Sequence, residues 1–145
     1  MGRLRSFARL APWERRLALR SHGWLLAARI ALRLLPFRVL RRFIDSCRAT
    51  TPRQGDEWPA AVRRGILRAA RSQPGSSCLA QAAAAELLLR WGGHPAQLTI
   101  GVASHAAEET VPLDAHAWVE SGGLIVAGER ELERYTALVR FGNDK

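Results

Sequence analysis

Apolar residues recur at helical spacing through the first half of the chain, on segments rich in arginine. This spacing predicts a helix over residues 13–34, which Pro36 ends. Residues 37–47 predict a second, shorter amphipathic helix. A turn-rich stretch at 50–59 follows, and residues 60–71 predict a third helix.

The pattern changes from helical to alternating in the second half. After a polar break at 72–77, CLAQAAAAELLLRW (78–91) is rich in strong helix formers and is followed by Gly92 and Gly93, which stop a helix. Residues 97–103 alternate apolar and other side chains and predict a half-buried strand. The remaining predicted elements are strands over 113–120 and 124–128, joined in a hairpin by Ser121-Gly122-Gly123, and one or two helical turns over 129–135.

This order of elements predicts the fold class. Helices come first, and a helix followed by three strands comes after them, which suits an α+β fold with a small antiparallel sheet packed on a helix. A chain of 145 residues can bury a hydrophobic core without disulfides or a structural metal. We expect a basic amphipathic helical segment over 1–59, used for partner docking, and a second domain over 60–145.

Charge is divided unevenly along the chain. The formal net charge is +9, but residues 1–72 hold 17 of the 22 basic residues and have a net charge of +13, whereas residues 73–145 have −4. A basic half favours an anionic partner. It carries no helix-turn-helix, zinc-finger or RNA-binding signature, and its aromatic residues fit an amphipathic core better than a base-stacking platform. We therefore do not expect a nucleic-acid partner.

The chain shows no secretory or membrane-spanning segment at the sequence level. Its start has no uninterrupted apolar core, and its most apolar stretch is broken by Arg29 and Arg33. Cys47 and Cys78 do not make a disulfide framework, and no Cys/His spacing indicates a metal site. These observations predict a cytoplasmic protein with reduced thiols.

Cys78 occupies a place where a thiol can be activated. Ser76 or Ser77 can cap the helix that begins there, and the unpaired N–H groups and dipole of a helix start favour a thiolate. The same N–H groups can form an oxyanion hole. The alternative is that Cys78 is a small buried apolar residue, as free cysteines often are. Cys47, at the end of an amphipathic helix, is expected to be structural.

His116 lies on a predicted strand between Ala115 and Ala117. Side chains alternate along a strand, so His116 shares one face with Trp118, and the alanines leave the other face open to close approach of a helix. Alone, a histidine in a strand is more often structural than catalytic. A cysteine at a helix start followed by a histidine on a strand, however, is the order used by one class of thiol enzymes.

The segments CLAQAAAAELLLRWGGHPAQLTIGV and LDAHAWVESGG carry a more specific resemblance. Together they resemble the transglutaminase-like cysteine peptidases of lasso-peptide biosynthesis, over roughly residues 60–128, and the preceding helices resemble the stand-alone form of that enzyme. The resemblance implies a transglutaminase/papain-like helix and sheet. It also implies removal of the leader from a ribosomally made precursor before macrolactam cyclisation, with Cys78 as nucleophile, His116 as general base and no metal or organic cofactor.

The group that orients His116 is left open by the sequence. The family uses an acid on the next strand, but a hairpin loop at 121–123 would pair His116 with Gly128. Glu129 is the nearest acid, and a bulge at Gly128 would be needed to turn it towards His116. Asp114, on the face of His116, is the second candidate, and a backbone or amide group is the third.

The resemblance also implies partners for the basic helical segment. Such peptidases work with a small leader-recognition protein and an ATP-dependent macrolactam cyclase, and the arginine-rich helices would be a docking surface for either. Peripheral membrane contact through 13–47 is the alternative use. The competing hypothesis for the whole chain is a non-catalytic transglutaminase-like binding module, and an acyl-transferring transglutaminase is a more distant one.

Overall fold

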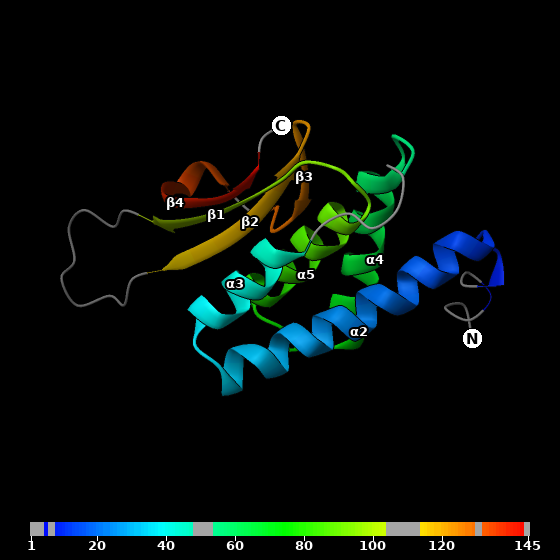
Figure 1. The fold of residues 1–145 in the computed structure, drawn as a ribbon, viewed down its shortest axis with the longest axis horizontal. Coiled ribbons are helices and arrows are strands. Elements are labelled where there is room, and N and C mark those ends of the chain that lie inside the picture. The colour runs from blue at the N-terminus through cyan, green and yellow to red at the C-terminus, as the bar shows by residue number, and fades with distance from the viewer. Residues whose placement is uncertain (1–4, 6–7, 48–53, 104–113, 130–131, 144–145) are drawn as a thin grey trace.

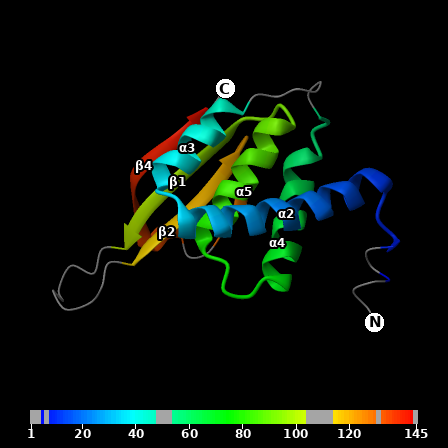
Figure 2. The ribbon, with the colours of Figure 1, turned by 60° about the horizontal axis from the view of Figure 1, so that its bottom comes forward.

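The protein folds into a layer of helices packed on one side of a sheet (Figure 1, Figure 2). The computed structural model describes residues 5, 8–47, 54–103, 114–129 and 132–143. Within these residues the helices are α2 (Pro12–Leu34), α3 (Phe37–Ser46), α4 (Trp58–Ser72) and α5 (Cys78–Trp91). The strands are β1 (Ala96–Ala103), β2 (Ala115–Ser121), β3 (Leu124–Ala127) and β4 (Tyr135–Asn143), with the 3₁₀ helix η1 (Leu132–Arg134) before β4. All pairings are antiparallel, in the order β3-β2-β1-β4, and the α+β prediction is confirmed.

Helix α5 is the central element of the fold. It contacts β1, β2 and β3 on one side and α2, α3 and α4 on the other. Its alanines present little side-chain bulk, so neighbouring elements approach closely, while Leu88 and Leu89 fill the core. Its bounds agree with the predicted range 78–91, because strong helix formers are followed directly by Gly92 and Gly93.

Ser77 caps α5 at the residue before Cys78. Its hydroxyl accepts a hydrogen bond from the Ala80 N–H at 3.1 Å, which satisfies one of the free donors of the first turn.

We expect Ser77→Ala to lower the free energy of unfolding by about 1 kcal/mol, measured by urea denaturation. Ser77→Asp should keep most of the wild-type stability, because aspartate can also cap a helix. Equal stability of the alanine variant and the wild type would show that this cap does not hold the helix start.

One hydrophobic core runs through the helical layer. Leu17 and Leu25 of α2, Val62 and Ile66 of α4 and Leu88 of α5 belong to a single cluster of buried residues. Residues on both sides of the boundary expected at 59–60 therefore share one core. The division of the chain into a docking segment and a peptidase domain stays a prediction.

The start of α4 differs from the predicted helix over 60–71. The helix begins at Trp58 because Pro59 occupies its first turn, where the missing N–H costs no hydrogen bond. The Trp58 indole donates to the Leu88 carbonyl at 3.0 Å and ties this helix start to α5. Positions 50–53 of the predicted turn-rich stretch lie outside the described residues.

Strand β4 was not predicted from the sequence, and this omission is an error. This strand pairs with β1 along the whole length of β1 and forms one edge of the sheet. Its sequence contains the strand formers Tyr135, Thr136, Val139 and Phe141, so a propensity signal was present, although apolar Leu138 breaks the alternation. The helical turns expected over 129–135 are reduced to η1, and residues 130–131 lie outside the described part of the chain.

The β2–β3 hairpin has a different register from the predicted one. Its loop is Gly122-Gly123 alone, with Ser121 opposite Leu124, because both glycines take positive φ values (55° and 85°), as a tight two-residue turn requires. An irregularity between Val119 and Glu120 then shifts the register again. The predicted backbone pairing of His116 with Gly128 is therefore wrong. Position 113, the predicted start of the first hairpin strand, lies outside the described residues.

Among the described residues, no helix combines the length and the apolar character that crossing a membrane requires.

Candidate functional site

One cavity contains both residues of the predicted catalytic pair. It has a volume of about 520 Å³ and lies where the start of α5, the start of β2 and the end of β3 meet. Cys78 and His116 both line it. Its other lining residues are Arg63, Leu67, Ser76, Gln81, Asp114, Ala115, Ile125, Val126, Ala127, Gly128, Glu129 and Tyr135. The cavity is therefore mixed in polarity, with charged side chains near its sulfur and imidazole groups.

Cys78 is the first residue of α5 and is partly buried. Among the described residues, the backbone N–H groups of Cys78 and Leu79 have no hydrogen-bond acceptor, as is usual at a helix start. These donors and the positive end of the helix dipole stabilise negative charge at this position. The sulfur therefore lies beside groups that can hold an anion.

Gln81 lines the same cavity one helical turn after Cys78, and the sequence reasoning missed it. Its side-chain amide donates to both the carbonyl and the hydroxyl oxygen of Ser76, each at 3.2 Å. These bonds fix the turn that leads into α5. The spacing of three residues from Cys78 was the signal that could have identified it, because such residues share a helix face.

Cys47 lies outside this cavity. It follows α3 directly and is a free, partly buried thiol. Burial raises the pKa of the Cys47 thiol, although the nearby Arg90 charge opposes this effect. A raised pKa favours the protonated, unreactive form, which agrees with the structural role expected for Cys47.

The imidazole of His116 is enclosed by two aromatic rings. Only 9% of the residue is exposed, and its ring centroid lies 5.0 Å from that of Tyr135 and 6.2 Å from that of Trp118. On the alternate positions of β2, Ala117 and Val119 belong to the hydrophobic core that includes α5. The prediction that the small residues allow a helix to approach β2 closely agrees with the contacts between α5 and β2.

A backbone carbonyl is the hydrogen-bond partner of His116. Its Nε2 atom lies 2.7 Å from the carbonyl oxygen of Gly128. A carbonyl oxygen can only accept, so Nε2 carries the proton and donates, and in the neutral ring Nδ1 bears the free lone pair. This bond therefore selects the tautomer in which Nδ1 is the nitrogen that can take a proton.

Gly128 presents this carbonyl through a backbone conformation that other residues rarely adopt. Its φ is +82°, and a Cβ placed there would collide with the carbonyl oxygen of Ala117 and lie 2.9 Å from the Cα of Trp118. Glycine therefore lets the chain leaving β3 pass close over β2, so that its carbonyl reaches His116.

The two predicted acids line the cavity but bind other groups. The carboxylate of Glu129 pairs with Arg63, whose guanidinium also donates to the Ile125 carbonyl at 3.2 Å. The carboxylate of Asp114 accepts a hydrogen bond of 3.0 Å from the Tyr135 hydroxyl. Among the described contacts neither acid bonds to His116, and the third predicted option, a backbone group, is what the geometry presents.

Arg63 and Tyr135 were not predicted as part of this site. Arg63 lies 66 residues before Glu129 in the sequence, and nothing in the local pattern of α4 separates it from the other arginines.

In the described part of the chain, no cluster of three or more His, Cys, Asp or Glu residues is arranged to hold a metal ion.

Comparison with known proteins identifies a family to which this chain is similar. A model of the transglutaminase-like superfamily matches residues 22–140, which include α3, α4, α5, β1, β2 and β3 together with most of α2 and β4. Neither the curated proteins nor the solved structures contain a match to this chain. Because the matched segment covers most of the sequence, the chain belongs to the transglutaminase-like superfamily.

Proposed function

We propose that this protein is a cysteine peptidase that removes the leader from a lasso-peptide precursor before macrolactam cyclisation. The observation that carries the proposal is the cavity shared by Cys78 and His116, with Nε2 of His116 bound to the Gly128 carbonyl. Membership of the transglutaminase-like superfamily and the His-Ala-Trp-Val-Glu segment, which resembles lasso leader peptidases, support it further.

The first half of the proposed reaction forms a thioester. Nδ1 of His116 takes the thiol proton, and the Cys78 sulfur attacks the scissile carbonyl carbon between leader and core. The carbonyl oxygen becomes an oxyanion, for which the free N–H groups at the start of α5 are the donors. His116 then gives its proton to the departing amine, so the core leaves with a new amino terminus and the leader stays bound through sulfur.

The second half releases the leader. His116 takes a proton from water, the resulting hydroxide attacks the thioester carbon, and the carbon–sulfur bond breaks. The sulfur leaves as the Cys78 thiolate, which regains a proton from His116, and the leader departs with a free carboxyl group. The Gly128 carbonyl stabilises the imidazolium that forms in each half, because it accepts a hydrogen bond from Nε2 throughout.

The partners and location follow from the same proposal. A small leader-recognition protein would bring the precursor to the cavity, and an ATP-dependent cyclase would use the free amine that cleavage produces. This maturation would take place in the cytoplasm. In the neighbourhood of the reading frame, the proposal calls for a short precursor, a small recognition protein and an asparagine-synthetase-like cyclase.

One observation favours the alternative of a non-catalytic binding module in the same complex. Glu129 and Asp114 bond to Arg63 and Tyr135, so no acid among the described contacts supports His116. The two functions are separated by incubating the protein with precursor and recognition protein and following the products by mass spectrometry. We expect one cut, at the leader–core bond. Intact precursor, bound to the protein but not cleaved, would instead establish the binding module.

Glu129 gives a sharper test of the role assigned to Gly128. We expect Glu129→Gln to change the rate of leader release by less than about tenfold, because it removes an exposed ion pair with Arg63 but not the hydrogen bond to His116. Asp114→Asn is the matched variant and should behave in the same way. A loss of about 10³-fold or more in either variant would identify that acid as the group that orients His116.

A further inference from the structure

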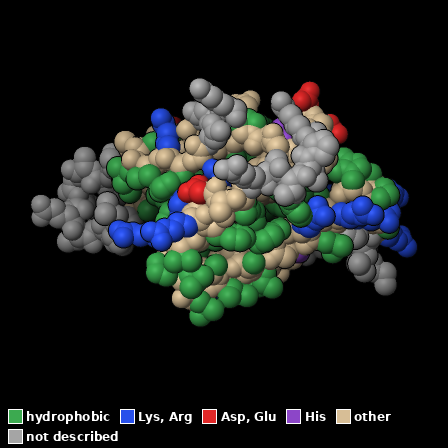
Figure 3. Space-filling model, in the orientation of Figure 1, with side chains coloured by type: hydrophobic (Ala, Val, Ile, Leu, Met, Phe, Trp, Pro, Cys, Tyr) green, Lys and Arg blue, Asp and Glu red, His purple; other side chains and the backbone are tan. Residues whose placement is uncertain are grey.

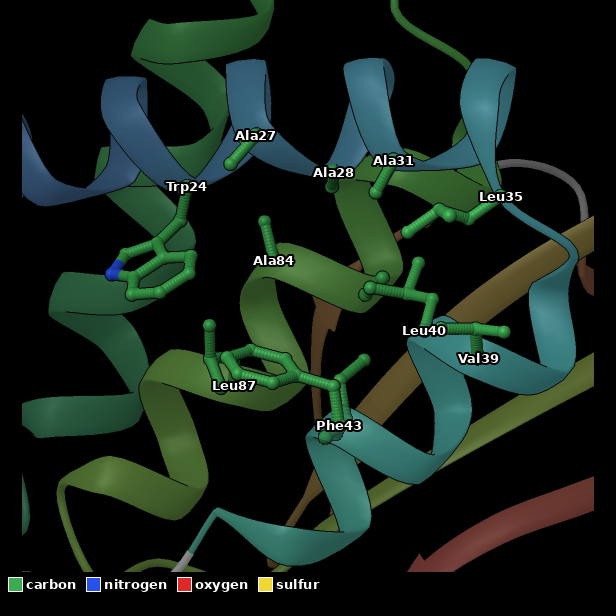
Figure 4. A pocket seen from close by; sticks show the side chains of 12 residues that line it. Trp24, Ala27, Ala28, Ala31, Leu35, Val39, Leu40, Phe43, Ala84 and Leu87 are labelled. Atoms are coloured by element: carbon green, nitrogen blue, oxygen red, sulfur yellow. The ribbon is translucent and has the colours of Figure 1, made fainter.

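A second hollow lies on the helical layer and is apolar throughout. Helices α2 and α3 form its walls and α5 its floor, and its volume is about 240 Å³ (Figure 4). The residues that line it include Trp24 of α2, Leu35 directly after α2, Val39 and Phe43 of α3, and Leu87 of α5. We call this hollow the helical groove. It shares no lining residue with the cavity of Cys78 and His116.

The walls of the helical groove expose apolar surface to solvent. Leu35, Val39 and Phe43 are 47%, 44% and 47% exposed, and the rings of Trp24 and Phe43 pack against each other with centroids 6.3 Å apart. Figure 3 shows hydrophobic side chains gathered on this face, with basic side chains at both of its ends. A contiguous apolar patch with a charged rim is typical of a binding surface.

The two helices that form the walls of the groove carry an excess of basic residues. Between Pro12 and Cys47 the chain has eight arginines and two acids. Both acids are already paired with arginine: Glu14 with Arg64, and Asp45 with Arg41 and Arg90. At the end of the groove the Arg20 guanidinium lies over the Trp91 ring, 4.4 Å from its centroid, one turn beyond Leu87 on α5. Positive charge that these two acids do not neutralise therefore accompanies the apolar groove, and Figure 3 shows basic side chains at both ends of this face.

This combination selects among the candidate occupants. A second copy of the chain would bring two arginine-rich faces together, and like charges repel. A bilayer surface is broad, whereas the floor of the groove at Ala84 and Leu87 lies between two helices, where the side chains of a single helix can reach. An amphipathic helix lays one apolar face into such a groove and keeps its polar face at the rim.

We propose that the helical groove binds an amphipathic helix of a partner protein, with large apolar side chains on one face and acidic side chains beside them. The apolar side chains pack against the exposed side chains of Leu35, Val39 and Phe43, and a carboxylate contacts Arg20 at the end of the groove. Because this groove and the cavity of Cys78 have separate linings, the partner stays bound while the cavity remains open to substrate. The proposal does not depend on catalysis by Cys78.

The probe that tests it is a fluorescent helical peptide of about 18 residues, with Leu and Phe on one face and Glu on its flanks. A second peptide keeps the apolar face and replaces each Glu with Lys. We expect the Glu peptide to bind the full-length protein at least about tenfold more tightly than the Lys peptide, with an affinity that falls as salt is raised. Equal affinity of the two peptides, or no binding of the Glu peptide, would overturn the proposal.

Paired variants locate the binding. Leu35→Ser/Val39→Ser changes two exposed groove residues, and Leu26→Ser/Ile30→Ser changes two α2 residues that are 49% exposed and do not line the groove. We expect the first pair to weaken binding of the Glu peptide by about tenfold and the second by less than about twofold, with circular dichroism showing that both remain folded. Equal weakening by the two pairs would place the peptide elsewhere and refute the assignment.

Charge and membrane binding are tested with the same protein. Arg20→Gln should weaken binding of the Glu peptide by about threefold and reduce its salt dependence, whereas Arg71→Gln, an exposed arginine of α4, should do neither. Sedimentation with vesicles of equimolar phosphatidylcholine and phosphatidylglycerol gives the other arm. Vesicle binding that the groove variant abolishes and the Glu peptide fails to displace would assign the groove to a lipid surface instead.

Discussion

Replacing His116 with alanine is expected to lower the rate of leader release by about 10³-fold or more. Cys78→Ala is expected to lower this rate below the detection limit. In the proposed mechanism His116 carries out every proton transfer, and the sulfur of Cys78 forms the thioester. Both line the same cavity, so removing either stops the same chemical step. The measurement is a time course of leader release by mass spectrometry, with precursor and recognition protein present.

Two controls keep this result specific. Cys47→Ala removes the other thiol, which lies outside the cavity, and should leave the rate unchanged. The double variant Cys78→Ala/His116→Ala should be no slower than Cys78→Ala alone, because residues that act as one unit do not lose activity additively. Cleavage by Cys78→Ala at the wild-type rate would show that another group is the nucleophile.

Glu86→Ala is expected to have the largest effect on stability, a loss of about 3–5 kcal/mol in the free energy of unfolding. Glu86 is fully buried in α5, and each of its carboxylate oxygens accepts a hydrogen bond of 2.7 Å from the Arg41 guanidinium of α3. Burial by itself lowers the pKa of Arg41, but the hydrogen bonds to Glu86 and then Asp45 outweigh it, so the pKa is raised and the charge persists. Without Glu86 the buried Arg41 charge keeps, among the described contacts, only Asp45 as an acidic partner.

Urea denaturation of a set of variants tests this explanation. The double variant Arg41→Met/Glu86→Leu should be more stable than Glu86→Ala, because it also removes the Arg41 charge that Glu86→Ala leaves without its buried partner. Asp45→Asn should cost less than about 1 kcal/mol, since the Asp45 side chain is half exposed. A small effect of Glu86→Ala, close to that of Asp45→Asn, would contradict the account. The ion pair also fixes α3 to α5, so Glu86→Ala should loosen the wall of the helical groove.

The pH dependence of this cluster has a defined sign. The hydrogen bond from Arg41 lowers the pKa of Asp45 below the ordinary aspartate value of 3.8, although partial burial opposes it. A lowered folded-state pKa means that Asp45 contributes stability above the unfolded pKa and that the contribution is lost as pH falls through the lower folded value. The acid limb of the stability curve, near and below 3.8, should therefore flatten in Asp45→Asn.

The elements predicted well from sequence are those that local chemistry determines. Helix α5 has its predicted bounds because helix formers fill it, Ser77 caps it and Gly92 follows it. Cys78 and His116 were selected because a cysteine at a helix start is followed by a histidine on a strand and because the segments around them resemble a known peptidase family. The structure then places both in one cavity, which the sequence pattern could only imply.

The features that were missed depend on contacts that no local pattern contains. The hairpin register needed the positive φ of Gly122 and Gly123, which reduce the loop to two residues. The partner of His116 is a main-chain carbonyl, so no side chain in the sequence could identify it. Glu129 pairs with Arg63 from a distant helix, and only the packed fold brings them together.

A mechanism-based label tests the central claim, that Cys78 and His116 act as one site, most directly. The probe is the leader peptide with a vinyl sulfone in place of the scissile amide, which reacts with an activated thiol, and the adduct is located by peptide mass spectrometry. We expect a single adduct on Cys78, none on Cys47, and labelling at least about tenfold slower in His116→Ala. Labelling of Cys47, or of Cys78 at the same rate without His116, would contradict the account.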